Sequence, residues 1–105
     1  MRPTVGYHTA GGLPLEILES ARRAVDAAVD KKASNIVLLD IREISTIADY
    51  FIICTGSNPR QINAVGDAMD EVLGKDGLHL LHREGNPDSG WVLLDFGDII
   101  CHIFG

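Results

Sequence analysis

The segment that most constrains the fold is the last fifteen residues, 91–105, which alternate in character on both sides of a glycine-containing turn. Glycine accepts the positive φ that a tight turn requires, so a two-residue turn at Phe96 and Gly97 predicts a β-hairpin. The predicted hairpin joins three residues of its first strand to three of its second: Asp95 with Asp98, Leu93 with Ile100, and Trp91 with His102.

The two faces of this hairpin differ, because successive side chains of a strand point to opposite sides. One face is apolar and is predicted to join the core: Val92, Leu94, Ile99, Cys101 and Ile103. The other mixes aromatic, aliphatic and acidic residues: Trp91, Leu93, Asp95, Asp98, Ile100 and His102. A partly wet aromatic residue ringed by polar groups is typical of a protein interface, so we expect a docking surface. The alternative is that a helix of the same chain covers this face.

The composition is that of a globular protein. A chain of 105 residues, 46% hydrophobic and 23% charged, suits one domain, and it has no apolar run of membrane-spanning length. Its opening residues lack a signal or transit pattern, which favours a cytoplasmic location. The net charge of −6 with nine scattered basic residues argues against a dedicated nucleic-acid binder and favours a basic protein partner. Cys54 and Cys101 have apolar neighbours and are interpreted as core residues.

The pattern along the chain predicts a flexible lead-in over residues 1–13 and a single domain over residues 14–105. A helix is expected from Pro14 to about Lys32, with an apolar face made by Leu18, Ala21, Val25, Ala28 and Val29. A second helix is expected from Pro59 to near Gly74 or Gly77. It would be capped by Asn58 and Gln61, with Ile62, Val65, Met69, Val72 and Leu73 on its buried face.

The remaining apolar runs read as strands. Residues 36–41 are predicted to be a strand buried on both sides, residues 49–55 a second and residues 78–83 a third, ahead of the closing hairpin. The order α-β-β-α-β-β-β predicts an α/β fold of α+β-like character: a two-layer sandwich whose mixed sheet of about five strands packs against two helices.

Candidate chemistry is sparse. Gly56, Ser57 and Arg60 open the second helix and could bind an anion, although a plainly capped helix start explains them better. Asp95 and Asp98 could bind a cation or act as an acid–base pair, or form an exposed hairpin end or partner contact. His79 and His82 would point to opposite faces of a strand, which suits a metal poorly. No catalytic residue, metal or cofactor is predicted.

Several separate motifs carry a resemblance to one family. They are residues 49–57, Arg60 with Gln61, Glu84 with Gly85, and residues 91–104. In this order and spacing they resemble the Iojap family, also called ribosomal silencing factor (RsfS), over residues 15–104. Family members usually continue past the last strand into a helical tail that this chain lacks, and residues 1–13 match nothing characteristic of the family.

The resemblance implies a non-enzymatic protein with a nucleotidyltransferase-like fold from which the catalytic carboxylates are absent. It also implies binding to large-subunit ribosomal protein fourteen, a block on joining of the two ribosomal subunits, and repression of translation when nutrients are short. Carried over to matching positions, the contact residues would be Trp91, Asp95, Asp98 and His102, with Tyr50 and Glu84 beside them.

Two other functions stay open. One is a phosphate- or nucleotide-binding protein that uses Gly56, Ser57 and Arg60. The other is a self-associating module in which the Trp91 face or an open sheet edge forms a homodimer. The sequence decides neither whether a dimer forms nor whether ribosomal RNA is touched at the rim of the surface.

Overall fold

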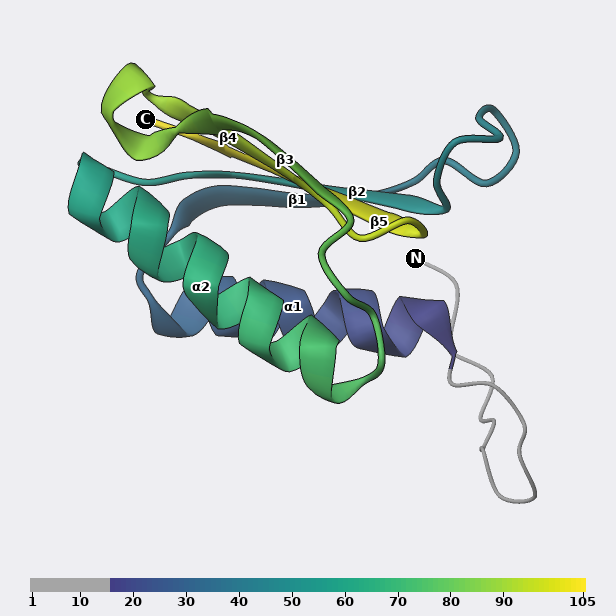
Figure 1. Cartoon of the computed structure of the whole chain (residues 1–105). Coiled ribbons are helices and arrows are strands. Elements are labelled where there is room, and N and C mark those ends of the chain that lie inside the picture. The colour runs from purple at the N-terminus through teal and green to yellow at the C-terminus, as the bar shows by residue number, and fades with distance from the viewer. Residues whose placement is uncertain (1–15) are drawn as a thin grey trace.

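The computed structural model describes residues 16–105 and has two layers, a sheet and a pair of helices (Figure 1). The elements follow the predicted order: α1 Ile17–Asp30, β1 Ser34–Asp40, β2 Tyr50–Thr55, α2 Pro59–Lys75, β3 His82–Asn86, the short 3-10 helix η2 Pro87–Ser89, β4 Trp91–Asp95 and β5 Ile99–Phe104. The expected lead-in of residues 1–13 and the start of the first helix at Pro14 lie outside the described residues.

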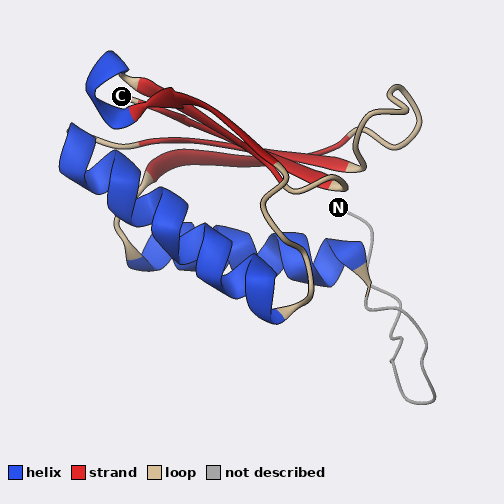
Figure 2. Ribbon diagram, in the orientation of Figure 1, coloured by secondary structure: helices blue, strands red, loops and turns tan. Residues whose placement is uncertain are grey.

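The sheet has five strands in the order β1-β2-β5-β4-β3. β2 and β5 run parallel, whereas the other neighbours run antiparallel, so the predicted mixed sheet is confirmed. Figure 2 shows both helices on the same side of this sheet. We call the side that they cover the helix face and the opposite side the outer face.

The core lies between the sheet and the helices. It combines the buried stripe of α1, the buried stripe of α2 and every second residue of the central strands. The apolar hairpin residues Val92, Leu94, Ile99, Cys101 and Ile103 are all at most 2% exposed, as predicted. Cys54 and Cys101 are free thiols inside this core, and burial raises the pKa of Cys54 to about 11. Both cysteines therefore act as small apolar residues.

The second helix begins and packs as its sequence indicates. The side chain of Asn58 accepts a hydrogen bond of 2.8 Å from the backbone N–H of Gln61, and Pro59 occupies the first turn. Ile62, Val65, Met69 and Leu73 are buried. The α1 face is corrected at one position: Val29 is 53% exposed and borders a groove beside the edge strand, while Ala24 is fully buried. No helix within residues 16–105 is long and apolar enough to cross a membrane.

Two strand predictions were wrong. β1 is an edge strand and not a strand buried on both sides, because the helices within residues 16–105 cover only the helix face; Val37 and Leu39 are 44% and 40% exposed. The third strand is His82–Asn86 and not residues 78–83. The register pairs His82 with Asp95 at one end and Asn86 with Trp91 at the other, so β4 determines which residues form this strand. Residues 78–81 connect α2 to the sheet.

The hairpin register was also wrong. The turn residues are Gly97 and Asp98, so Asp95 pairs with Ile100, Leu93 with His102, and Trp91 with Phe104. Phe96 is drawn into the core at 3% exposure, and the Asp95 carboxylate accepts a 2.8 Å hydrogen bond from the N–H of Gly97 at the turn. The shift is two residues, which preserves the side to which each side chain points. The predicted division into an apolar and a mixed face therefore holds for the strand residues, whereas Asp98 lies in the turn.

Candidate docking surface

The outer face is uncovered by any helix among residues 16–105 (Figure 2). The strand registers place side chains from all five strands on it: Val37 and Leu39 of β1, Phe51, Ile53 and Thr55 of β2, Ile100, His102 and Phe104 of β5, Trp91, Leu93 and Asp95 of β4, and His82, Glu84 and Asn86 of β3. Apolar residues dominate from β1 to β4, and polar residues gather on β3. The predicted alternative of a helix covering the hairpin is not observed in the part of the chain that the structure describes.

Aromatic rings gather around His102. The ring of Phe51 meets the imidazole edge-on at a centroid distance of 5.1 Å, and the ring of Phe104 lies nearly parallel to it at 6.3 Å. The Nε2 atom of His102 is buried and has no hydrogen-bond partner among the described residues. Burial lowers the pKa of this imidazole, so it is neutral at pH 7 and contributes an aromatic surface.

Trp91 lies beside this cluster, opposite Phe104 across the β4–β5 pair. Its position depends on Gly85 of β3, which has a φ of 76°. A Cβ atom on Gly85 would stand 2.8 Å from Cε3 of the Trp91 ring and closer still to the Trp91 carbonyl oxygen. The tryptophan therefore packs directly against the backbone of β3, which only glycine permits.

The polar side of the surface is formed by β3 and β4. Nε2 of His82 lies 2.7 Å from Oε2 of Glu84, and both side chains are exposed. Asp95 is half-buried on the outer face. Asp98, which the sequence predicted to face it, lies instead in the exposed turn, where its carbonyl oxygen accepts hydrogen bonds from the N–H groups of Asp49 and Tyr50. The two carboxylates therefore do not form a pair on one face.

Two predicted site residues are buried. Tyr50 is 1% exposed and belongs to the helix-face core, because the alternation in β2 turns Phe51, its neighbour, outward. Ile100 points to the outer face but is only 7% exposed, since Ile41 and Ala48 of the β1–β2 loop pack over it. The structure thus brings together Trp91, Leu93, Asp95, His102 and Glu84, and it separates Tyr50 from them.

Several outer-face residues escaped the sequence analysis: Val37, Leu39, Phe51, Ile53, His82 and Phe104. The predicted hairpin register paired Trp91 with His102 and so did not place Phe104 opposite Trp91. For Phe51 and Ile53 the signal was present in residues 49–55, where odd and even positions point to opposite faces.

Two backbone N–H groups of the predicted anion site already have hydrogen-bond acceptors. The N–H of Gly56 donates to the carbonyl oxygen of Phe104 at 2.7 Å, and the N–H of Ser57 donates to the side chain of Gln61. These are the donors that a phosphate would need. Arg60 is exposed at the same helix end. The arrangement favours the capped helix start over an anion site, with Gln61 reaching back to Ser57 and not to Asn58 as the predicted capping box required.

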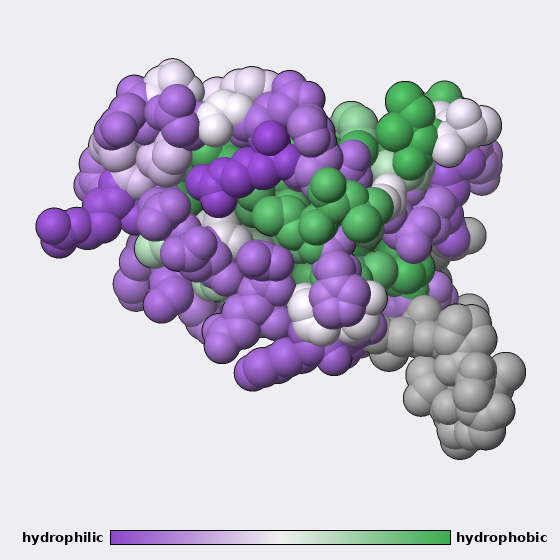
Figure 3. All heavy atoms as spheres, viewed as in Figure 1, coloured by the Kyte–Doolittle hydropathy of each residue, from purple (hydrophilic) through white to green (hydrophobic). Residues whose placement is uncertain are grey.

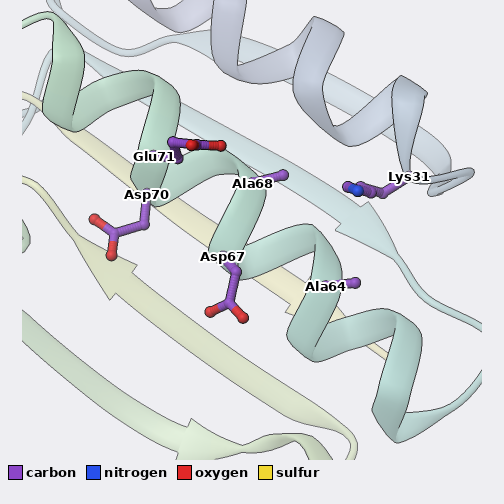
Figure 4. Close-up of a pocket in the computed structure, with 6 residues that line it drawn as sticks. All are labelled: Lys31, Ala64, Asp67, Ala68, Asp70 and Glu71. Atoms are coloured by element: carbon purple, nitrogen blue, oxygen red, sulfur yellow. The ribbon is translucent and has the colours of Figure 1, made fainter.

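A separate hollow lies on the helix layer and is lined by Lys31, Ala64, Asp67, Ala68, Asp70 and Glu71. Figure 4 shows Ala64, Ala68 and Glu71 on the side of α2 toward Lys31, with Asp67 and Asp70 pointing away from it. Within residues 16–105 no group of three or more His, Cys, Asp or Glu side chains could hold a metal ion. The outer face is therefore the site with the clearest architecture.

Comparison with known proteins gives a consistent result. The family described as "Ribosomal silencing factor during starvation" matches residues 14–105. Ribosomal silencing factor RsfS of Halalkalibacterium halodurans is 39% identical over 89 residues, which are 85% of this chain and 74% of the relative. The RsfS of Bacillus subtilis is 38% identical over 88 residues, 84% of this chain and 72% of the relative. The chloroplastic protein Iojap of Zea mays is 35% identical over 85% of this chain and 39% of its own length.

Solved structures agree with the fold. Protein CV0518 from Chromobacterium violaceum superposes with a TM-score of 0.78 at 31% identity, covering 86% of this chain and 75% of that one. A crystal structure from Bacillus halodurans gives a TM-score of 0.74 at 36% identity, covering 83% of this chain and 81% of that one. By its family match, its relatives and its fold, this chain belongs to the ribosomal silencing factor (RsfS/Iojap) family.

Proposed function

We propose that this protein binds large-subunit ribosomal protein fourteen through its outer face and so prevents the large and small ribosomal subunits from joining. The observation that carries the proposal is an aromatic face, which no helix within residues 16–105 covers, on a protein of the ribosomal silencing factor family. Translation would be repressed in this way, above all when nutrients are limiting, in the cytoplasm where subunits join. The nucleotidyltransferase-like description that the resemblance implies stays a prediction.

The composition of the outer face supports a protein partner. Tryptophan and other aromatic residues supply most of the binding energy at the centre of protein interfaces, and polar residues form the rim. Here Trp91, Phe104 and Phe51 lie near His102, while Glu84 and His82 stand at one side. The net charge of −6 favours association with a basic ribosomal protein by electrostatic attraction.

The proposed mechanism is steric. While the factor occupies the joining side of the large subunit, a small subunit cannot bind there. Each factor molecule therefore removes one large subunit from the joining reaction. No covalent step, cofactor or turnover is needed, and the protein would act as a stoichiometric regulator and not as an enzyme. Trp91, Leu93, Asp95, His102 and Glu84 would make the contact. Asp98 and Ile100 would lie at its end, and Tyr50 would support it from the core.

The test is the affinity of a Trp91→Ala variant for purified bacterial large subunits, measured by co-sedimentation. We expect a loss of roughly 2 kcal/mol or more, as for an interface hot spot. Val29→Ala is the matched control, because Val29 is exposed on the helix layer, away from the outer face. A folded Trp91→Ala variant that binds as tightly as the unchanged chain would show that the outer face is wrongly assigned.

Self-association is a second use of the same surface that the exposed apolar residues favour. Val37, Leu39 and Phe104 are each at least 40% exposed on the outer face, and two copies could bury them against each other. A dimer of this kind would compete with ribosome binding. Sedimentation velocity of the unchanged chain and of Phe104→Ser would detect it as a dimer that the substitution dissociates.

A further inference from the structure

The loop between β1 and β2, residues 41–49, exposes two large apolar side chains. Ile44 is 84% exposed and Ile47 is 75% exposed. In Figure 1 this loop projects beyond the end of the sheet, and Figure 3 shows hydrophobic atoms in the same place. Two such solvated isoleucines three residues apart on one short loop are typical of a surface that another molecule covers.

The loop holds its shape by its own hydrogen bonds. The N–H groups of Ile44 and Ser45 donate to the carbonyl oxygen of Ile41 at 3.1 and 2.9 Å, and the N–H of Ile47 donates to Oγ of Ser45 at 3.0 Å. The N–H of Ile41 donates to the carbonyl oxygen of Asp49 at 2.9 Å, which closes the base. The isoleucines are therefore presented on a built turn, which lowers the entropy lost on binding.

The loop is continuous with the outer face. Ile41 and Ala48, at its two ends, are buried with Ile100, and the partly buried Phe51 and Leu93 pack against the same cluster. A molecule seated on Leu93 and Phe51 would thus extend without a break to the loop. The two exposed isoleucines and the aromatic cluster form two parts of one surface.

The base of the loop is acidic. Burial raises the pKa of the Asp49 carboxyl, and the negative charges of Asp98, Asp40 and Glu16 raise it further, so several carboxylates share this end of the molecule. Arg42, within the loop, is held by both carboxylate oxygens of Asp40, with Nε–Oδ1 and Nη2–Oδ2 distances of 2.9 and 2.6 Å. A partner that fits here needs an apolar depression with basic groups beside it.

We infer that the loop of residues 41–49 is a second contact of the same interface, in which Ile44 and Ile47 enter an apolar depression with a basic rim on the ribosomal partner. This inference rests on the proposed function, because it takes the occupant to be the ribosomal protein that covers the outer face. The contact would add a second point of attachment and so help to fix the orientation of the partner along the sheet.

The experiment compares Ile44→Ser/Ile47→Ser with the unchanged chain in co-sedimentation titrations with purified bacterial large subunits. Both side chains are exposed, so the thermal midpoint should stay close to that of the unchanged chain. We expect the dissociation constant to rise about tenfold or more, as when interface anchors are truncated. Val29→Ser, an equivalent change on the helix layer, should leave the dissociation constant unchanged.

The outcomes separate this inference from the proposed function. If the unchanged chain does not bind large subunits, the proposed function fails and the inference fails with it. If the unchanged chain binds, Trp91→Ala binds weakly and the double variant binds normally, only the inference is overturned. If the double variant binds normally, and sedimentation velocity shows a dimer for the unchanged chain but a monomer for the double variant, the occupant is a second copy. That result also overturns the inference.

Discussion

At the scale of single residues, two glycines in the left-handed conformation have different roles. Gly85 has a φ of 76° and Gly90 a φ of 81°. A Cβ atom on Gly85 would collide with Trp91, whereas one on Gly90 would meet no atom within 4 Å. Gly90 is thus required only by its backbone conformation, while Gly85 is required by its backbone and also by the neighbouring tryptophan.

This contrast predicts different effects of the same substitution. Gly85→Ala and Gly90→Ala should both lose stability, because a left-handed L-residue costs roughly 1–2 kcal/mol. Only Gly85→Ala should also shift the fluorescence of Trp91, the single tryptophan of the chain, and weaken binding to large subunits. The measurement is the emission spectrum and affinity of both folded variants. Emission and affinity that match the unchanged chain in Gly85→Ala would contradict the close contact.

His102 predicts a dependence of stability on pH. Burial lowers its pKa in the folded protein below the ordinary value of 6.5. As pH falls through that value the unfolded chain takes up the proton first, so the free energy of unfolding decreases until pH is below the folded pKa. The measurement is urea unfolding at several pH values between 7.5 and 5.5. The free energy of unfolding should decrease less for His102→Asn than for the unchanged chain. Equal losses in both proteins would show that His102 does not titrate abnormally.

At the scale of elements, the helices are joined to each other by a polar contact that ends α2. Oδ2 of Asp76 accepts hydrogen bonds from Oγ of Ser20 at 2.7 Å and from Nε and Nη2 of Arg23 at 3.0 and 2.6 Å. Ser20 is fully buried, whereas the Arg23 side chain is 42% exposed. The buried hydroxyl bond should therefore matter more than the ion pair.

Asp76→Ala and Arg23→Ala test this difference. Asp76→Ala leaves the buried Ser20 hydroxyl without this acceptor and should cost about 1–3 kcal/mol of stability. Arg23→Ala removes an exposed ion pair and should cost less than about 1 kcal/mol. Urea unfolding of both variants measures the difference. Equal costs would contradict the ranking, and affinity for large subunits should change in neither variant because the contact lies on the helix layer.

Elements with local signals could be predicted from sequence. Asn58 and Pro59 marked the start of α2, and the aromatic and β-branched run of residues 50–55 marked β2, because caps and propensities act within a few residues. The register of the hairpin could not be predicted from sequence, because it depended on whether Phe96 lay in the turn or in the core. The position of β3 failed for a related reason, since pairing with β4 and not local propensity defines that strand.

The candidate site was only partly predictable. Trp91, Leu93, Asp95 and His102 follow from alternation in one hairpin, which is a local pattern. Phe51 and Leu39 join them only because β2 pairs with β5 and β1 pairs with β2, and such neighbours come from distant parts of the chain. The burial of Tyr50 and the cover over Ile100 likewise depend on the packing of the helices and of the loop 41–49.

At the scale of the whole molecule, the two faces of the sheet have different roles. The helices on one side bury the core and stabilise the sheet, which leaves the outer face free to carry aromatic residues without loss of the fold (Figure 2). An open, half-apolar sheet is an aggregation hazard for an isolated protein. The proposed function answers this hazard, because a partner would cover the face.

The most direct test of the central claim is subunit joining. Purified bacterial large subunits are incubated with the 105-residue chain, small subunits are added, and the joined fraction is read from a sucrose gradient. The account predicts that the joined fraction falls as the chain is added, reaches its minimum near one chain per large subunit, and is restored by Trp91→Ala. A chain that sediments with the large subunit while the joined fraction stays constant would contradict the steric mechanism.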